Sequence, residues 1–371
     1  MKMVGIIFSN IYDSNMGELT RHRTMASVPF GSRYRQIDFV LSSMVNSNIS
    51  TVGVITKYNY QSLMDHLGSC SEWDLNRKNG GLYIIPPFST GHLDIYRGKI
   101  EALYGALTFL RKVNAQYVVL SDSTVLCNID FEAVLDAHMQ SDVDVTVVCN
   151  KEAPLFEGEK RDLVLKCDGS RVLDVLANST FGKNEFGSMG MFVMAREELI
   201  RVVENCVAHG FYHFERDYIQ REFNRDNINV GVYHFKNTVL RNEDVLCYFR
   251  NNLRLMDREV RNDIFTPDSP IYTKVRDEVP AYYGPDARVN GCLIADGCNI
   301  YGEAEHSVIF RDVTIEPGSR VRNSIIMQGT HIGRGADLNY VILDKEVKVR
   351  DGAVLTGAPV SPVIVNKARE I

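Results

Sequence analysis

Residues 28–67 have the sequence VPFGSRYRQIDFVLSSMVNSNISTVGVITKYNYQSLMDHL. In the first half of this stretch apolar residues recur at helical spacing, at Phe39, Leu41, Met44 and Val45. The following run, 51–56, is short, apolar and rich in β-branched residues, which is typical of a buried parallel strand. Helical spacing returns in 61–67. The stretch therefore predicts a loop, a helix, a strand and a second helix in close succession, as in the α/β class.

Composition limits the classes of protein to which this chain can belong. Its 371 residues predict one large or two moderate domains, with ordinary globular proportions of hydrophobic (45%) and charged (24%) residues. A net charge of −6 gives no electrostatic reason to expect nucleic acid or a membrane as partner. Eight cysteines without a C-x-x-C pair are expected to be small buried hydrophobes in a reducing compartment. The apolar start, 4–8, is too short for a signal peptide, so a cytoplasmic location is expected.

The apolar period changes near the C-terminus. Four of the eleven prolines lie between residues 267 and 285, which indicates a linker or an extended crossing segment. Beyond it apolar residues recur every six positions with glycines between them, for example at Ile326, Ile332 and Leu338. This pattern predicts a left-handed parallel β-helix with three short strands per turn. The open ends of a β-helix present unpaired strand edges, so capping or oligomer contacts are expected there.

The order of motifs in 28–67, P-F-G-x-x-Y-R-x-I-D-F, then V-N-S-x-I, then V-G-V-x-T, resembles the sugar-phosphate nucleotidyltransferases that make ADP-glucose. In that family a catalytic domain is followed by a β-helix used for subunit contact and regulation, so the resemblance covers nearly the whole chain. It implies a Rossmann-like nucleotidyltransferase domain with a mixed, mainly parallel sheet in 1–256. A linker in 257–290 and the left-handed β-helix in 291–371 complete the expected organisation.

The loop after the first expected strand departs from the family. Active members carry a G-G-x-G-x-R-L loop whose backbone N–H groups cradle the triphosphate. Here residues 9–19 are SNIYDSNMGEL, with one glycine. Asp13 and Glu18 are expected to place negative charge where the triphosphate would lie, and each unit-charge contact at 4 Å costs about 1 to 4 kcal/mol. The family's lysine before V-P-F-G aligns with Met25, so the loop is not expected to hold ATP reactively.

The family's metal-binding aspartates are also altered. The first lies in L-S-G-D-H, which corresponds to the end of the expected strand 117–120. A gapless alignment puts Ser123 at this position and a shift by one residue puts Asp122 there, so both assignments stay open. The second metal aspartate falls on Arg241. Asp130 matches the start of the next helix, where it is expected to act as N-cap.

The sugar-binding positions follow the same trend. In 93–107 the family's central T-A-D has become Lys99, Ile100 and Glu101, which leaves a helix start. The sugar-binding aspartate of D-F-G is His213 and its glycine is Glu215. The lysine that grips the sugar phosphate has no counterpart in 176–179.

Two groups of residues keep a resemblance to ligand-binding positions. Ser188-Met189-Gly190 matches the family's S-M-G, which contacts glucose 1-phosphate; a tight strand entry is the alternative. In regulated members, residues that match His22, Arg23 and Arg35 line a pocket for a phosphorylated activator. Arginines bind phosphate through charge-assisted hydrogen bonds, whereas the alternative is a solvated loop and helix start.

These departures resemble the noncatalytic, regulatory subunit that some bacteria pair with a catalytic ADP-glucose pyrophosphorylase subunit in glycogen synthesis. The resemblance implies a catalytically inactive subunit of glucose-1-phosphate adenylyltransferase, with no catalytic residues, metal or cofactor of its own. It also implies a hetero-oligomer with the catalytic subunit, expected to be a tetramer, and a phosphorylated metabolite as effector.

Two other functions stay open. The chain could be an active adenylyltransferase that forms ADP-glucose and pyrophosphate from ATP and glucose 1-phosphate, using Mg²⁺ and Asp122. A β-helix acyltransferase would need a histidine at a coil interface, for which His306 and His331 are the candidates. Each of these histidines is more simply interpreted as lying on a solvated corner.

Overall fold

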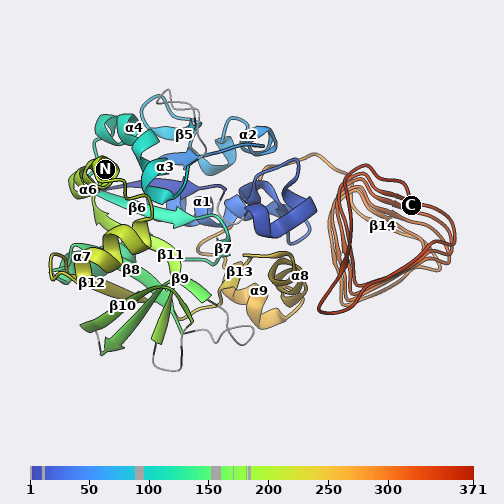
Figure 1. Cartoon of the computed structure of the whole chain (residues 1–371). Coiled ribbons are helices and arrows are strands. Elements are labelled where there is room, and N and C mark those ends of the chain that lie inside the picture. The colour runs from blue at the N-terminus through green and yellow to red at the C-terminus, as the bar shows by residue number, and fades with distance from the viewer. Residues whose placement is uncertain are drawn as a thin grey trace.

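The computed structural model describes residues 2–10, 13–87, 96–151, 160–169, 171–180, 182 and 185–371. The N-terminal part is an α/β domain, and the C-terminal part is a triangular β-helix that lies beside it (Figure 1). Residues 93–95, at the start of the segment compared above, lie outside the described residues. Among the helices of the described chain, none has both the length and the apolar character needed to cross a bilayer.

A mixed sheet forms the centre of the α/β domain. Within the described residues its strands are β1 (Met3–Phe8), β4 (Thr51–Ile55), β5 (Gly81–Ile85), β6 (Tyr117–Asp122), β8 (Val145–Asn150), β9 (Lys160–Asp168), β10 (Arg171–Thr180), β11 (Glu185–Ala195) and β12 (Val230–His234). Strands β5, β4, β1 and β6 pair in parallel in that order, and β11 pairs antiparallel with β6, β8 and β9. The predicted sheet, mixed and mainly parallel, is confirmed.

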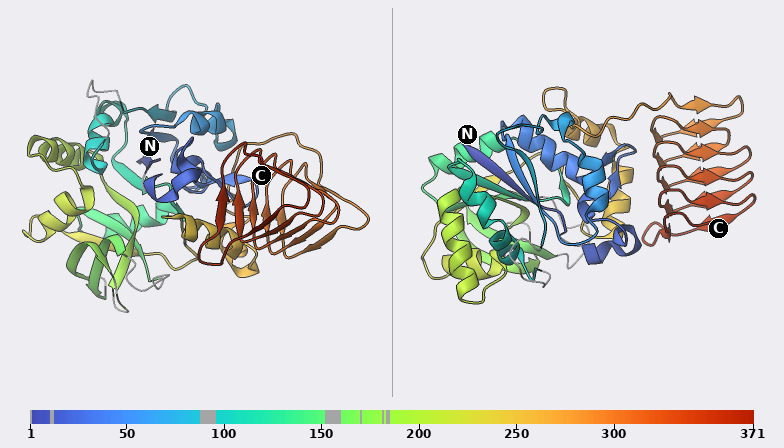
Figure 2. Two further views of the ribbon diagram at one scale, coloured as in Figure 1. Left: turned by 45° about the vertical axis from the view of Figure 1, so that its right-hand side comes forward. Right: turned by 90° about the horizontal axis from the view of Figure 1, so that it is seen from above.

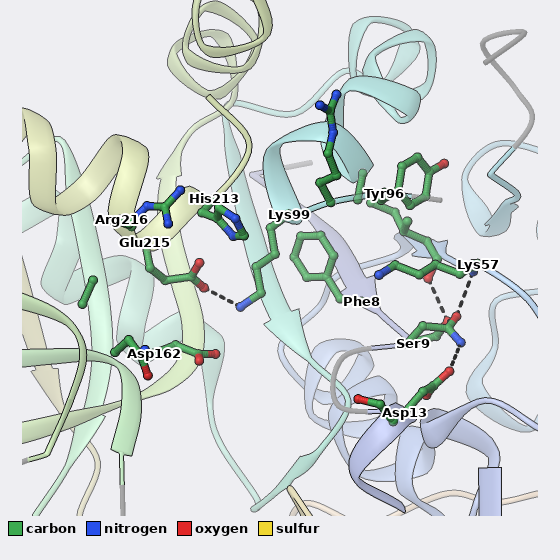
Figure 3. Close-up of a pocket in the computed structure, with 18 of the residues that line it drawn as sticks. Phe8, Ser9, Asp13, Lys57, Tyr96, Lys99, Asp162, His213, Glu215 and Arg216 are labelled. Atoms are coloured by element: carbon green, nitrogen blue, oxygen red, sulfur yellow. Dashed lines mark hydrogen bonds and ion pairs between the residues drawn. The ribbon is translucent and has the colours of Figure 1, made fainter. Parts of the chain in front are cut away.

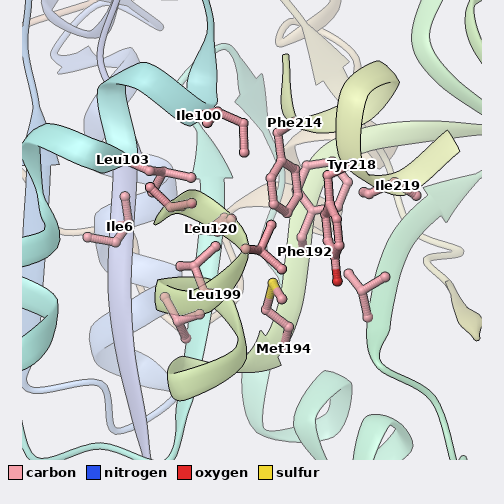
Figure 4. Close-up of a cluster of buried hydrophobic side chains, with 14 of the residues drawn as sticks. Ile6, Ile100, Leu103, Leu120, Phe192, Met194, Leu199, Phe214, Tyr218 and Ile219 are labelled. Carbon is pink, nitrogen blue, oxygen red and sulfur yellow. The ribbon is translucent and has the colours of Figure 1, made fainter. Parts of the chain in front are cut away.

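Helices cover both faces of this sheet, which explains why its central strands are apolar throughout. In β1, Ile6 packs into one buried cluster and Ile7 into the other, because successive side chains of a strand point to opposite faces. Figure 4 shows the first cluster, in which Phe192 and Phe214 pack with ring centroids 5.2 Å apart. The covering helices are α1 (Gln36–Asn46), α2 (Gln61–Leu67) and α5 (Phe131–Gln140) on the Ile7 face, and α3 (Lys99–Gly105), α4 (Leu107–Lys112) and α6 (Arg196–Ala208) on the Ile6 face.

Local signals fix where the helices begin. The Asp130 side chain accepts hydrogen bonds from the backbone N–H groups of Glu132 and Ala133, so its predicted role as N-cap of α5 is confirmed. The carboxylate of Asp38 accepts the backbone N–H of Arg35 at 2.9 Å and closes the first turn of α1. Smaller elements complete the domain: β2 (Pro29–Phe30), β3 (Tyr34–Arg35), β7 (Val125–Leu126), β13 (Leu240–Arg241), η1 (Asp13–Thr20), η2 (Met25–Ser27), η3 (Ser71–Trp73), η4 (Phe214–Gln220), α7 (Arg221–Phe223), α8 (Val245–Arg254) and α9 (Arg258–Ile264).

The C-terminal repeat forms the predicted left-handed parallel β-helix. Three parallel five-stranded sheets make its sides, and its coils stack one above another (Figure 2). The strands run from β14 (Tyr282–Tyr283) to β28 (Val363–Val365). Helix α9 and the first β-helix strand therefore both lie within 257–290, the segment expected as a linker. The remaining strands are β15 (Arg288–Asn290), β16 (Leu293–Ile294), β17 (Asn299–Ile300), β18 (Glu303–Glu305), β19 (Val308–Ile309), β20 (Thr314–Ile315), β21 (Arg320–Arg322), β22 (Ile325–Ile326), β23 (His331–Ile332), β24 (Asp337–Asn339), β25 (Val341–Leu343), β26 (Lys348–Val349) and β27 (Val354–Thr356).

One side of the β-helix is packed against the α/β domain. Phe30 and Phe249 of the domain share a buried cluster with Phe310 and Met327 of the β-helix. Within this interface both carboxylate oxygens of Asp344 accept hydrogen bonds from Nη2 of Arg23, each at 2.8 Å. Both side chains are only 4% exposed, so each charge depends on the other for stabilisation.

Replacing Arg23 tests this dependence. Arg23→Met leaves the Asp344 carboxylate buried without its cation, and we expect the free energy of unfolding to fall by about 3 to 5 kcal/mol. Arg21→Met removes an exposed ion pair with Glu18 and is the matched control, with an expected loss of about 1 kcal/mol or less. Denaturant unfolding of both variants measures the difference. Equal losses would show that the buried pair does not hold the two parts together.

Candidate functional site

A cavity of about 700 Å³ opens at the carboxyl ends of the parallel strands. Phe8 and Ser9 line it from the end of β1, Ile55 from the end of β4, and Lys99 from the start of α3. Figure 3 shows Phe8, Ser9 and Lys99 across the cavity from Glu215 and Arg216 of η4. Ligands of open α/β sheets bind at this edge, so the cavity is the first candidate site.

The loop after β1 brings negative charge into this cavity. Asp13 lines it, and one carboxylate oxygen accepts the backbone N–H of Met25 at 2.8 Å while the other accepts the side-chain amide of Asn10. Burial raises the pKa of Asp13 to about 6. Glu18, the other acidic residue expected there, instead pairs with Arg21 and accepts a hydrogen bond from Asn366 of the β-helix. That expectation was wrong for Glu18.

Lys99 forms the most buried ionic cluster of the cavity. Its ammonium donates to Asp122 Oδ2 at 2.9 Å and to Glu215 Oε1 at 2.6 Å, and the lysine side chain is 6% exposed. Burial alone would lower the pKa of Lys99, but the two carboxylates outweigh it and raise that pKa above its usual range. The sequence analysis interpreted Lys99 only as part of a helix start. The paired changes at 99 and 215, one cationic and one anionic, are the signal that could have found this contact.

At the end of β6, Asp122 and not Ser123 is the group that faces Lys99. Asp122 is the last residue of the strand and carries the ion pair, whereas the backbone N–H of Ser123 donates to Phe8 O at 3.3 Å. Asp122 packs directly on Gly190, where a Cβ would lie 2.3 Å from Oδ2 and where φ is +67°. Only glycine fits there, so Gly190 is required for the placement of Asp122.

The predicted sugar-phosphate residues form a bulge of β11. The register shifts between Ser188 and Met191, and the backbone N–H of Gly190 donates to Ser188 Oγ at 3.1 Å. Met189 is fully buried in the core. Within the described residues, none of the three is part of the cavity lining. The Ser188 carbonyl accepts a hydrogen bond from Nη2 of Arg241 at 2.7 Å, and Nη1 of Arg241 donates to Glu243 at 3.0 Å.

The family implies a Mg²⁺ ion here, but these residues do not fit one. Oδ2 of Asp122 is engaged by an ammonium, and the position of the second metal aspartate holds a buried guanidinium. In the described part of the chain no three His, Cys, Asp or Glu side chains converge as a metal site.

A second, strongly basic pocket lies between the two parts of the chain. Its volume is about 40 Å³, the space of about three water molecules or one small anion. The cationic side chains that line it are Arg33, Arg35, Lys274, Arg276, Arg311 and Lys345. Nη2 of Arg311 is buried without a hydrogen-bond partner in the described residues. Burial and the nearby Arg35 and Arg23 lower the pKa of Lys345 to about 7.

The three predicted effector residues occupy different environments. Arg35 lines the basic pocket and donates to the backbone carbonyl and hydroxyl of Ser62. Arg23 is committed to Asp344, and His22 is exposed and outside the lining. Lys274, Arg276, Arg311 and Lys345 were missed because they come from the crossing segment and the β-helix. In the sequence, Arg311 and Lys345 are recognisable as cations within otherwise apolar repeats, whereas Lys274 and Arg276 are cations of the crossing segment.

The histidines considered for acyl transfer are both exposed. Nδ1 of His306 lies 3.1 Å from Asn323 Oδ1, and Nε2 of His331 lies 3.3 Å from Glu316 Oε1. His306 lies at a solvated corner, as expected, whereas His331 is exposed but lies in strand β23.

Comparison with known proteins places both parts of the chain. Residues 12–154 match the nucleotidyl transferase family, and residues 280–359 match the GlmU-like, C-terminal hexapeptide family. The chain is 32% identical to the glycogen biosynthesis protein GlgD of Bacillus subtilis over 370 residues, which cover 99% of this chain and 96% of that protein.

The chain belongs to the GlgD family. GlgD of Geobacillus stearothermophilus is 37% identical over 86% of this chain and 83% of its own. The glucose-1-phosphate adenylyltransferase of Bacillus cereus is 28% identical over 95% and 94% of the two chains. The match to the GlgD family therefore includes both the cleft and the basic pocket.

The basic pocket of this GlgD family member predicts a pH-dependent anion site. We expect sulfate, whose charge is constant in this range, to bind about tenfold more weakly as pH rises from about 6 to about 9, because Lys345 loses its proton. Lys345 faces Arg23, Arg35, Arg276 and Asp344, and burial lowers the pKa of neighbouring His66. Lys345→Met is expected to weaken binding and flatten its pH dependence. Isothermal calorimetry measures both, and an unchanged profile in the variant would contradict the assignment.

Proposed function

We propose that this chain is a noncatalytic, regulatory subunit of glucose-1-phosphate adenylyltransferase that acts in glycogen biosynthesis in the cytoplasm. Two relatives named glycogen biosynthesis proteins, and more distant relatives named glucose-1-phosphate adenylyltransferase, support the pathway and the partner. The partner in this proposal is the catalytic subunit, in a hetero-oligomer that we expect to be a tetramer.

The observation that carries the proposal is the charge balance of the cleft. Adenylyl transfer from ATP depends on cations that neutralise the triphosphate. Three of the four lysine and arginine side chains that line the cavity in the described residues are instead paired with carboxylates: Arg97 with Glu101, Lys99 with Asp122 and Glu215, and Arg216 with Asp217. Burial lowers the pKa of the fourth, Lys57. Asp13 adds a further negative side chain to the lining. Removal of one charge-stabilising group costs about 3 to 4 kcal/mol of transition-state stabilisation, so these changes together support an inactive site without metal or cofactor.

The basic pocket supports the regulatory part of the proposal. Its cations come from the α/β domain, the crossing segment and the β-helix, so an anion bound there contacts all three. We propose a phosphorylated metabolite as the effector, held by Arg35 with Arg311 and Lys345 in place of the predicted His22 and Arg23. Exposed apolar side chains of the β-helix, Val354, Val360, Tyr282 and Tyr283, offer contacts for another subunit.

Mixing with the catalytic subunit tests the proposal. Adenylyl transfer is measured with ATP, glucose 1-phosphate and Mg²⁺ for this chain alone, for the catalytic subunit alone and for the mixture. We expect no turnover by this chain alone and an altered rate or effector response in the mixture. Size-exclusion chromatography of the mixture should show a new species larger than either subunit. An unchanged rate together with unchanged oligomer sizes would contradict the proposal.

The retained carboxylate of Asp122 favours one second candidate, an active adenylyltransferase. Turnover by the chain alone that depends on Mg²⁺ and is lost in Asp122→Asn would support that candidate and overturn the inactive-site proposal. Asp162→Asn, at an exposed carboxylate on the cavity rim, is the matched control for a change of charge.

A further inference from the structure

The Lys99 cluster joins the two halves of the α/β domain across the cleft. Lys99 begins α3 and Asp122 ends β6, on the half that contains β1, β4 and β5. Glu215 lies in η4, whose buried residues Phe214 and Tyr218 pack with β9, β10 and α6 on the opposite half. Figure 3 shows the Lys99 side chain extending across the floor of the cavity to Glu215. The ammonium is thus one of the contacts between the two sides, beside the backbone hydrogen bond from Ile100 N–H to the Tyr212 carbonyl and the packing of α3 against α6.

The ammonium disfavours a divalent cation beside it. Two unit charges at 4 Å interact by about 4 kcal/mol at an effective dielectric constant of 20, and a doubly charged ion doubles this repulsion. Oδ1 of Asp122 is buried without a hydrogen-bond partner in the described residues, and one buried water would satisfy it. The ammonium already supplies the positive charge that the carboxylates of Asp122 and Glu215 require.

The sequence changes at the two ends of the contact are complementary. Compared with the family motifs above, a threonine position holds Lys99 and a glycine position holds Glu215. Glu215 alone would bring a second carboxylate near Asp122 without a cation between them. Together the two changes form a cluster in which one ammonium contacts two carboxylates.

We infer that the Lys99 ammonium replaces the divalent cation at Asp122 and braces the two halves of the domain in one fixed arrangement. Its two carboxylate contacts, from opposite sides of the cleft, resist opening of the cavity in the absence of metal and nucleotide. The inference concerns the isolated chain and does not depend on the proposed regulatory role.

A double-mutant cycle measures the brace. Lys99→Met leaves two carboxylates buried without their cation, and we expect the unfolding equilibrium constant to rise about a hundredfold or more. In the double variant Lys99→Met/Glu215→Gln, the unfolding equilibrium constant should rise by less than the product of the two single fold-changes. Arg77→Met is the control, because Arg77 forms an exposed pair with Asp74 outside the cavity lining and should change the constant by about fivefold at most. Fold-changes that multiply independently in the double variant would contradict the inferred contact between Lys99 and Glu215.

Hydrogen exchange locates the effect. Lys99→Met should speed amide exchange in both 99–105 and 214–220, and Arg77→Met should not. A change confined to 99–105 would show local helix destabilisation and overturn the inference. If Lys99→Met does not fold, the variant that combines it with Asp122→Asn and Glu215→Gln carries no charge at these three positions and should fold; failure of this variant as well would show that Lys99 acts through packing alone.

Manganese binding tests the replacement of the metal. Electron paramagnetic resonance of Mn²⁺ with the wild-type chain should show no site that Asp122→Asn removes. A wild-type Mn²⁺ site that is lost in Asp122→Asn would overturn the inference. The unfolding, hydrogen-exchange and manganese measurements all use this chain alone, so their failure is separate from failure of the mixing assay.

Discussion

The ion pair between Lys99 and Asp122 determines how the cleft is arranged. Asp122 ends a central parallel strand in a place that water does not reach, and a buried carboxylate is stable only when it is paired or protonated. Gly190 must lack a side chain so that the carboxylate can lie there, and α3 must begin where Lys99 can reach it. Glu215 then balances the lysine from the opposite side. Each of these features follows from burying one negative charge at the end of β6.

The contact between the domain and the β-helix differs from the cleft, because its cations are not all matched by carboxylates. There Arg23 and Asp344 neutralise each other, but the adjacent cations outnumber the carboxylates near them. The lowered pKa of Lys345, caused by burial and then by neighbouring arginines, shows that this crowding is unfavourable. The apolar interface formed by Phe30, Phe249 and Phe310 offsets the repulsion. An anion that enters the pocket relieves the repulsion and so stabilises the folded chain by mass action.

The sequence predicted the scaffold because its signals are local. The helix, strand and helix of 28–67, the Asp130 cap and the six-residue period each depend on neighbouring residues in the chain. The sites were less predictable because their residues are far apart: Lys99 and Glu215 are 116 positions apart, and Arg23 and Asp344 are 321 apart. Charge type alone could not show that Arg23 was already paired whereas Arg35 faces a pocket.

The two sites differ in how their charges are matched, and this difference bears on what each can bind. In the cleft the cations Lys99 and Arg216 are held by carboxylates of the same chain, so a polyanionic ligand would have to displace an existing partner. In the basic pocket Nε of Arg311 pairs with Asp296, but Nη2 has no hydrogen-bond partner among the described residues, so an anion gains a hydrogen bond without breaking one. Because an unsatisfied buried donor gains from a ligand, anion binding is favoured between the domains rather than in the cleft. This difference supports the proposal that the cleft has lost the electrostatics of catalysis and that an effector anion binds between the domains.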